Sequence, residues 1–249
     1  MTDEIDTLRQ KRKQLCIGLF LLTATLLGCN TIGVLGISSG LSKALASAQL
    51  PQTSLYSADA YYDRAIENIR QGYSDRALAD FEEAIKLDPR NARLYNRRGI
   101  LRYTLGNLDD ALTDFNKALE INPQYAQAYR NRGKVRERQG DIRGAIGDLT
   151  RAVRLNPKDL DAFYGRGVIR MHVNDLTGAL EDMNRVTAID PNYARAFMTR
   201  GFIYQRLQQP EAAILEFFQV LALSDDRQLR RIAENELRGL GVEIPGGET

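Results

Sequence analysis

The sequence is poor in the residues from which most catalytic and metal sites are built. Its 249 residues include one histidine, His172, two cysteines and no tryptophan. Both cysteines, Cys16 and Cys29, lie in an apolar segment near the N-terminus, so the chain beyond residue 30 has no disulfide framework and no thiolate metal site. The single histidine likewise excludes histidine-based metal and catalytic clusters.

The sequence also lacks the short motifs of common enzyme classes and the charge of a nucleic-acid-binding protein. It contains no glycine-rich phosphate loop, no nucleophile elbow and no paired metal-ligand motif. The 34 Lys and Arg residues are nearly balanced by 32 Asp and Glu residues, giving a net charge of +2. Because nucleic-acid affinity depends on many cationic phosphate contacts, this balance argues against it. We therefore expect no enzyme activity, no metal or cofactor and no nucleic-acid partner.

The N-terminus has a basic segment followed by an apolar one, which is the pattern of an export signal. The apolar, uncharged run extends from Leu15 to Ile37. The basic residues that precede it are Arg9, Lys11, Arg12 and Lys13. Within the run, residues 26–29 (Leu-Leu-Gly-Cys) resemble the lipobox of bacterial lipoproteins, in which the cysteine is lipidated and becomes the mature N-terminus. This resemblance implies a signal peptide over residues 1–28 and lipidation of Cys29.

Two other outcomes stay open for this segment. Residues 15–37 are long enough to span a bilayer as an uncleaved anchor. Cleavage near Ala44-Leu45-Ala46 or Ala46-Ser47-Ala48 would instead release the protein, since both fit a small-x-small cleavage site.

The distribution of charge around the apolar run predicts its orientation in a membrane. Only Lys43 follows the run closely, so the positive-inside rule keeps the N-terminus in the cytoplasm. We expect a lipid-anchored or single-pass protein whose folded part faces a periplasm, a lumen or the cell exterior. Residues 29–57, rich in Ser, Ala and Gln from Ile37 onward, are expected to be the linker to that folded part.

The rest of the chain repeats itself with a period of 34 residues. The recurring positions are Gly99, Gly133, Gly167 and Gly201; Ala77, Ala111, Ala145, Ala179 and Ala213; and Pro89, Pro123, Pro157 and Pro191. A fixed period of this length is typical of stacked helical repeats. One copy reads Tyr95, Gly99, Ala111, Phe115, Ala118 and Pro123 at its recurring positions. This order resembles the tetratricopeptide repeat (TPR) pattern of an aromatic residue, Gly, Ala, a bulky residue, Ala and Pro.

The resemblance implies an all-α solenoid of two-helix repeats. The repeats are expected over 58–91, 92–125, 126–159, 160–193 and 194–227, followed by a capping helix and tail over 228–249. The capping helix has an apolar stripe of Leu229, Ile232, Ala233, Leu237 and Leu240, which is expected to cover the last repeat. Pro210 fits the first turn of the second helix in the fifth repeat.

Within each repeat, small residues are expected where the two helices cross. In the copy that begins at residue 92, the helices are predicted over 92–105 and 108–120. The residues expected to end the first helices in a left-handed conformation are Gly106, Gly140 and Asn174. The residues expected to cap the second helices are Asn107, Asp141 and Asp175.

An arginine and an acidic residue also recur with the 34-residue period. The arginines are Arg64, Arg98, Arg132, Arg166 and Arg200, and the acids are Asp80, Asp114, Asp148 and Asp182. These arginines could cover apolar surface and pair with the acids between helices, or they could form an array for a ligand. We favour a ladder of inter-helix ion pairs.

The resemblance further implies that the first helices of the repeats line a concave groove that binds partner segments. Transferred by repeat position, the groove side includes Tyr62, Arg97, Tyr103, Arg130, Lys134, Arg138, Tyr164, Met171, Met198 and Phe202. Basic side chains interleaved with aromatic and Met surface suit a peptide with acidic and apolar residues. The alternative is that these charges are simply solvated. A chaperone-type carboxylate clamp is not expected, because Gly165 occupies a position that requires Asn.

The sequence therefore predicts a membrane-tethered scaffold that binds proteins through its groove. One alternative is a structural protein that self-associates into a homo-oligomer. Another is an assembly factor for membrane protein complexes, as some TPR proteins of photosynthetic membranes are.

Overall fold

A computed structural model describes residues 57–244. The chain divides into two units, residues 1–52 and 53–249, and the description below concerns the second. The predicted signal peptide, anchor, cleavage sites and Cys29 lie outside the described residues, and so do residues 245–249. Between residues 57 and 244, no helix combines the length and apolar character that a membrane crossing requires.

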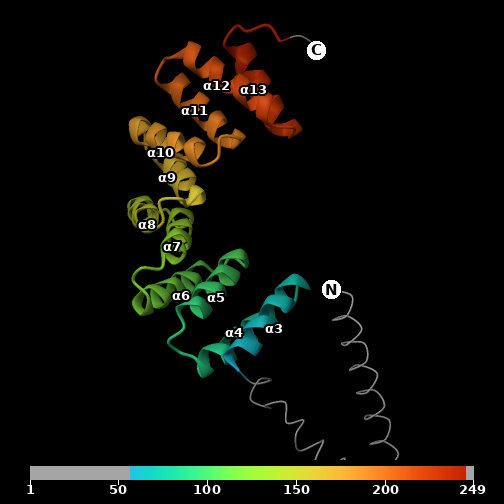
Figure 1. Ribbon diagram of the computed structural model, residues 1–249, viewed down its shortest axis with the longest axis vertical. Coiled ribbons are helices and arrows are strands. Elements are labelled where there is room, and N and C mark those ends of the chain that lie inside the picture. Colours follow the sequence, from blue (N-terminus) through green and yellow to red (C-terminus); the bar gives the residue numbers. More distant parts are fainter. Residues whose placement is uncertain (1–56, 245–249) are drawn as a thin grey trace, which may run out of the picture. The chain divides into compact units, whose positions relative to one another are not determined.

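The described chain consists of consecutive helices that pack in pairs, as Figure 1 shows. The first helices of the pairs are α3 (Ala58–Arg70), α5 (Ala92–Thr104), α7 (Ala126–Arg138), α9 (Leu160–His172) and α11 (Ala194–Arg206). The second helices are α4 (Ser74–Leu87), α6 (Leu108–Ile121), α8 (Ile142–Leu155), α10 (Leu176–Ile189) and α12 (Pro210–Leu223). A last helix, α13 (Arg227–Gly239), packs against α12. The predicted all-α solenoid with a capping helix is confirmed, and each first helix begins 34 residues after the previous one.

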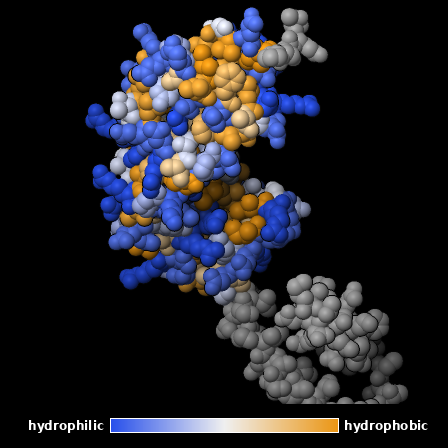
Figure 2. Space-filling view, turned by 45° about the horizontal axis from the view of Figure 1, so that its top comes forward, coloured by the Kyte–Doolittle hydropathy of each residue, from blue (hydrophilic) through white to orange (hydrophobic). Residues whose placement is uncertain are grey.

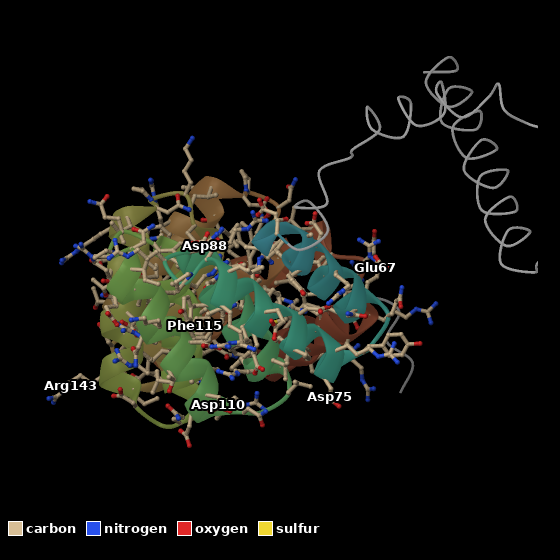
Figure 3. The ribbon with its side chains drawn as sticks, turned by 90° about the horizontal axis from the view of Figure 1, so that it is seen from below. Glu67, Asp75, Asp88, Asp110, Phe115 and Arg143 are labelled. Carbon is tan, nitrogen blue, oxygen red and sulfur yellow. The ribbon has the colours of Figure 1, made fainter. Side chains whose placement is uncertain are left out.

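The core of each pair is a large side chain packed against a small residue at the helix crossing. The large residues are Phe81, Phe115, Leu149, Met183 and Phe217, all buried. A Cβ atom added to Gly99 would lie 2.9 Å from Cε1 of Phe115, and one added to Gly201 would lie 2.4 Å from Cε1 of Phe217. Figure 3 shows Phe115 among the helices, whereas Asp75, Asp110 and Arg143 lie at the periphery. The crossing glycines are therefore required by packing.

The turns between paired helices follow the predicted pattern with one exception. Gly106, Gly140 and Asn174 have φ values of 85°, 83° and 68°, as expected for residues that end a helix in the left-handed region. Asp141 and Asp175 cap the following helices by accepting hydrogen bonds from the amides of Gly144 and Gly178. Asn107 occupies the same position, but its side chain makes no capping hydrogen bond within the described chain. Pro210 is the first residue of α12, as predicted.

The capping helix α13 buries only part of its apolar stripe. Ala233 and Leu237 are fully buried against the last repeat. Ile232 is 37% exposed, so this residue covers the last repeat only in part. Part of the apolar stripe of α13 therefore remains accessible.

Contacts between alternate helices show which helices lie on the inner side of the stack. α5 contacts α7, α7 contacts α9, and α9 contacts α11. First helices of neighbouring pairs thus approach one another directly. In a curved stack the helices on the concave side are the closest together, so this face is the candidate groove.

Candidate protein-binding groove

Each first helix is joined to its partner helix by an ion pair, in which the acid is buried and the arginine is largely buried in every pair except the first, where Arg64 is exposed. The pairs are Arg64–Asp80 at 2.5 Å, Arg98–Asp114 at 2.7 Å, Arg132–Asp148 at 2.7 Å, Arg166–Asp182 at 2.6 Å and Arg200–Glu216 at 2.7 Å between nitrogen and oxygen. This confirms the predicted ladder for the four aspartates. The arginines of the second to fifth pairs are largely buried between the paired helices, which favours the ladder over an array for a ligand.

A second arginine, one helical turn further along the first helix, reinforces the ladder in the three central pairs. The second set of pairs is Arg102–Asp114 at 2.9 Å, Arg136–Asp148 at 2.8 Å and Arg170–Asp182 at 3.0 Å. Sequence reasoning missed these residues, although they also recur every 34 positions. In the first pair Asn68 takes this place and donates to Asp80, and in the fifth pair the position is Tyr204.

Within the described chain, the fifth ion pair leaves polar atoms of both partners without hydrogen bonds. Glu216 replaces the aspartate and contacts Arg200 through one oxygen only. Among the described residues, the buried Nε of Arg200 and Oε2 of Glu216 have no hydrogen-bond partner. Burial raises the pKa of Glu216 above its ordinary value of 4.5, and the nearby Arg200 lowers it only in part.

Successive first helices are joined by a contact between residues 29 positions apart. Asn96 donates to the hydroxyl of Tyr125 at 3.3 Å. At the next interface Arg130 forms an ion pair with Asp159 at 2.7 Å. In the following one, the rings of Tyr164 and Tyr193 meet edge to face, with their centroids 5.4 Å apart. We call these three contacts the inter-repeat joints. Arg130 and Tyr164, both predicted groove residues, therefore also hold neighbouring repeats together.

Three other predicted groove cations remain available on the inner side. Arg97 and Arg138 are exposed, and Lys134 is half-buried. None of the three forms an ion pair within residues 57–244. The guanidinium of Arg138 lies 5.4 Å from the ring centroid of Tyr103, which brings these two predicted residues together. The middle of the groove thus presents positive charge beside an aromatic surface.

An acidic residue, Glu137, lies close to these cations on α7. It is half-buried, and desolvation raises its pKa, an effect that Lys134 and His172 partly offset. The basic character of the groove is therefore moderated at this point by a carboxylate that is itself partly shielded from water.

Two of the predicted groove residues are largely buried. Tyr62 packs edge to face against Phe81, and the guanidinium of Arg93 covers its ring at 4.2 Å. Met198 is 5% exposed but lines a cavity together with its neighbours. Tyr62 therefore belongs mainly to the core of the first repeat, and Met198 to the wall of a pocket.

That cavity lies between α9, α11 and α13 and has a volume of about 380 Å³. The predicted residues that line it are Tyr164, Met171, Met198 and Phe202. The residues that sequence reasoning missed include Val168 and, from the capping helix, Leu229 and Ile232. Figure 2 shows that one side of the described surface is hollowed and that hydrophobic residues lie within the hollow. The C-terminal part of the groove is therefore an apolar pocket with one wall made by α13.

Comparison with protein families identifies the repeats. Models described as TPR repeat or tetratricopeptide repeat match residues 58–91, 81–113, 101–140 and 130–194. Residues 58–194 are tetratricopeptide repeats. The fifth pair, α11 and α12, lies largely beyond these matches but repeats the same glycine crossing and ion pair.

Solved structures share this TPR fold. YrrB, described as a TPR protein with an unusual peptide-binding site, is 25% identical, with 78% of this chain and 97% of that chain covered and a TM-score of 0.61. MamA is 22% identical, covering 69% and 96% of the two chains with a TM-score of 0.60. PilF of Pseudomonas aeruginosa is 18% identical, covering 81% and 93% with a TM-score of 0.66. No curated protein matches the sequence significantly.

The candidate groove contains no metal-binding cluster in its described part. No group of three or more His, Cys, Asp or Glu residues within 57–244 could hold a metal ion. The chemistry that the groove does offer is charge, hydrogen bonding and apolar contact. All three serve the recognition of a protein segment.

Proposed function

We propose that this protein is a non-enzymatic, membrane-tethered scaffold that binds partner proteins through the concave face of its repeats. One observation supports this most directly: the face formed by the first helices combines unpaired cations with an open apolar pocket. Arg97, Lys134 and Arg138 supply the charge, and the pocket lies further along the same face. Exposed charge beside apolar surface is the chemistry with which grooves bind peptide segments.

The likeness to YrrB supports a peptide as the bound element. YrrB has a peptide-binding site according to its description, and the structural match covers 97% of YrrB and 78% of this chain. The present groove would serve a corresponding role with its own side chains. The partner is expected to be acidic in part, because the exposed groove cations would attract carboxylates.

The membrane tether rests on the N-terminal sequence. We propose that Cys29 is lipidated, with an uncleaved anchor over 15–37 as the alternative, and that the repeats face a periplasm, a lumen or the exterior. Acyl chains on one cysteine would anchor the protein, since each buried methylene contributes about 0.8 kcal/mol. Intact-mass measurement of the membrane-bound protein tests this: a mature chain that begins at Cys29 and bears lipid supports lipidation, and an unmodified chain from Met1 refutes it.

Site-specific photo-crosslinking tests the groove. A photoreactive phenylalanine at Tyr103, on the groove side of α5, should give adducts with a partner protein in the native membrane. The matched position is Arg143, an exposed residue on α8 outside the groove. Adducts that form equally at both positions would contradict groove binding. Adducts of the protein with itself at Tyr103 would favour the self-associating alternative.

A further inference from the structure

We propose that the pocket between α9, α11 and α13 is an anchor site for bulky apolar side chains of the partner segment, whose acidic residues bind the cations of α5 and α7. This inference rests on the proposed function and deepens it. It assigns the capping helix a direct part in binding. The partner chemistry that follows is a segment with an apolar end and an acidic end.

The chemistry of the groove changes at one helix boundary. Lys134 on α7 corresponds, at 34-residue intervals, to Val168 on α9 and Phe202 on α11. Glu137 on α7 corresponds in the same way to Met171 on α9. The row that begins at Lys134 is therefore charged on α7 and apolar on α9 and α11, and the row of Glu137 is apolar on α9. A partner segment lying along the groove would meet the two chemistries one after the other.

The capping helix continues the apolar row. Leu229 and Ile232 of α13 line the pocket, and Ile232 keeps 37% of its surface exposed. A helix that served only to shield the last repeat would present a polar face to water at this position. The exposed apolar surface instead forms the third wall of the pocket.

The rim of the pocket carries one carboxylate and one cation. Asp226 lies at the rim, but its carboxylate is already used to cap α13, accepting from the amides of Gln228 at 2.9 Å and Leu229 at 3.3 Å. Arg195 also lies at the rim and is exposed, and in the part of the chain that the structure describes it forms no ion pair. Arg195 is therefore available to an acidic residue of a partner next to the apolar anchor.

A glycine on α9 leaves space at the floor of the groove. Glycine inside a helix is unfavourable relative to alanine, so packing usually explains it. At Gly167 packing does explain it, because an added Cβ would lie 2.3 Å from Cε of Met183. At Gly165 the nearest described atom would be Cδ1 of Leu149 at 3.9 Å, an ordinary contact distance. Gly165 lies one turn before Val168 on the groove side of α9, so it keeps the groove floor open where a partner would lie.

The probe that tests this inference is a short synthetic peptide with acidic residues at one end and Leu, Phe and Leu at the other, made in both chain directions. The comparison peptide replaces the acidic residues with lysines. We expect the full-length protein to bind at least one acidic peptide and to prefer it to its lysine counterpart by about tenfold, with weaker binding at high salt. Failure of both acidic peptides to bind, or equal binding of the lysine peptides, would overturn the inference.

Variants at the pocket wall separate the anchor site from the rest of the groove. Ile232→Ser should weaken peptide binding about tenfold and leave its salt dependence unchanged, because an apolar contact is lost. Leu215→Ser is the matched control: Leu215 is 67% exposed on α12, a second helix, and its replacement should leave binding unchanged. Lys134→Ser should weaken binding and reduce its salt dependence.

A second matched pair tests the open groove floor. Gly165→Met should preserve the melting temperature but block the peptide, because the new side chain fills the space above α9. Gly147→Met is the control, since Gly147 lies in α8 with no described atom within 4 Å of an added Cβ. Loss of binding in Lys134→Ser together with normal binding in Ile232→Ser and Gly165→Met would refute the anchor site and leave the proposed groove function standing. Crosslinking at Tyr103 tests that function separately.

Discussion

The third and fifth helix pairs are each joined by an arginine–carboxylate ion pair, but the hydrogen bonding of the carboxylate is complete only in the third. In the third pair, the carboxylate of Asp148 accepts hydrogen bonds from Arg132 at 2.8 and 2.7 Å and from Arg136 at 2.8 Å. In the fifth pair, Glu216 forms one ion pair with Arg200 at 2.7 Å, and each partner retains an unpaired buried polar atom within the described chain.

This difference shows how closely the ladder depends on side-chain length. A bidentate arginine–carboxylate pair requires both nitrogens of one edge to face both oxygens. The extra methylene of Glu216 turns the carboxylate out of this arrangement, and Tyr204 cannot supply the second cation that Arg136 provides in the third pair. The ladder therefore stabilises the central repeats more than the last one.

The largest expected effect is from removing the central carboxylate. Asp148→Ala leaves two arginines between helices without their common acceptor and should cost about 3 kcal/mol of unfolding free energy. Glu216→Ala should cost clearly less, because only one arginine loses a partner. Chemical denaturation of both variants measures the difference. Equal losses would show that the two rungs contribute alike.

Overpacking the crossing of the third pair should come next. Gly133→Leu forces a side chain into a site where an added Cβ already lies 3.1 Å from Cγ of Leu149 and 3.3 Å from the carbonyl oxygen of Ala145. We expect a loss of about 1–3 kcal/mol or more, since the helices cannot separate without disturbing both neighbouring repeats. Gly147→Leu, in open space on α8, is the control. An unchanged melting temperature in Gly133→Leu would contradict the crossing.

Shortening the acid of the fifth pair should make it resemble the third. Glu216→Asp lets the carboxylate face the edge of Arg200, as Asp148 faces Arg132. We expect a gain of about 1 kcal/mol, because two buried polar atoms acquire partners. The reverse change, Asp182→Glu, should lower the free energy of unfolding. Chemical denaturation of both variants tests the role of side-chain length. A gain in both variants would contradict it.

The smallest effect concerns pH. The folded-state pKa of Glu216 lies above its ordinary value of 4.5, so the native state holds this proton more tightly than the unfolded state does. The contribution of Glu216 to stability is therefore fully present below about pH 4.5 and is lost as the pH rises through the folded-state pKa. Relative to Glu216→Gln, the wild-type protein should lose stability over this window in thermal melts. If the stability of the wild-type protein and of Glu216→Gln changed in parallel with pH, the raised pKa of Glu216 would be contradicted.

Most of the fold could be predicted from the sequence because the repeat fixes it locally. The same kind of contact or backbone conformation recurs in several repeats at Gly99 and its equivalents, at the left-handed Gly106 and Gly140, and at the recurring arginines. The interactions that define a repeat lie within about one period of sequence, so their spacing reveals them. Arg136 and its equivalents were equally visible but were overlooked.

The groove was less predictable because its side chains differ from repeat to repeat. Nothing in the period indicates that Arg130 binds Asp159, since the corresponding contact is a tyrosine hydrogen bond in one interface and a ring contact in the next. The pocket was missed for another reason. Ile232 belongs to an apolar stripe that suggested a buried helix face, yet it keeps 37% of its surface exposed and lines the pocket.

The inter-repeat joints have a consequence for how such a chain can grow. Both members of each joint lie inside one 34-residue segment that starts at the first residue of a first helix: Asn96 and Tyr125 precede Ala126, and Arg130 and Asp159 precede Leu160. A gene duplication or recombination event with its crossover at these boundaries would move both partners together. Each joint could then change its pair of residues without separating one partner from the other. For the same reason, a segment could be inserted or exchanged at these boundaries in an engineered protein.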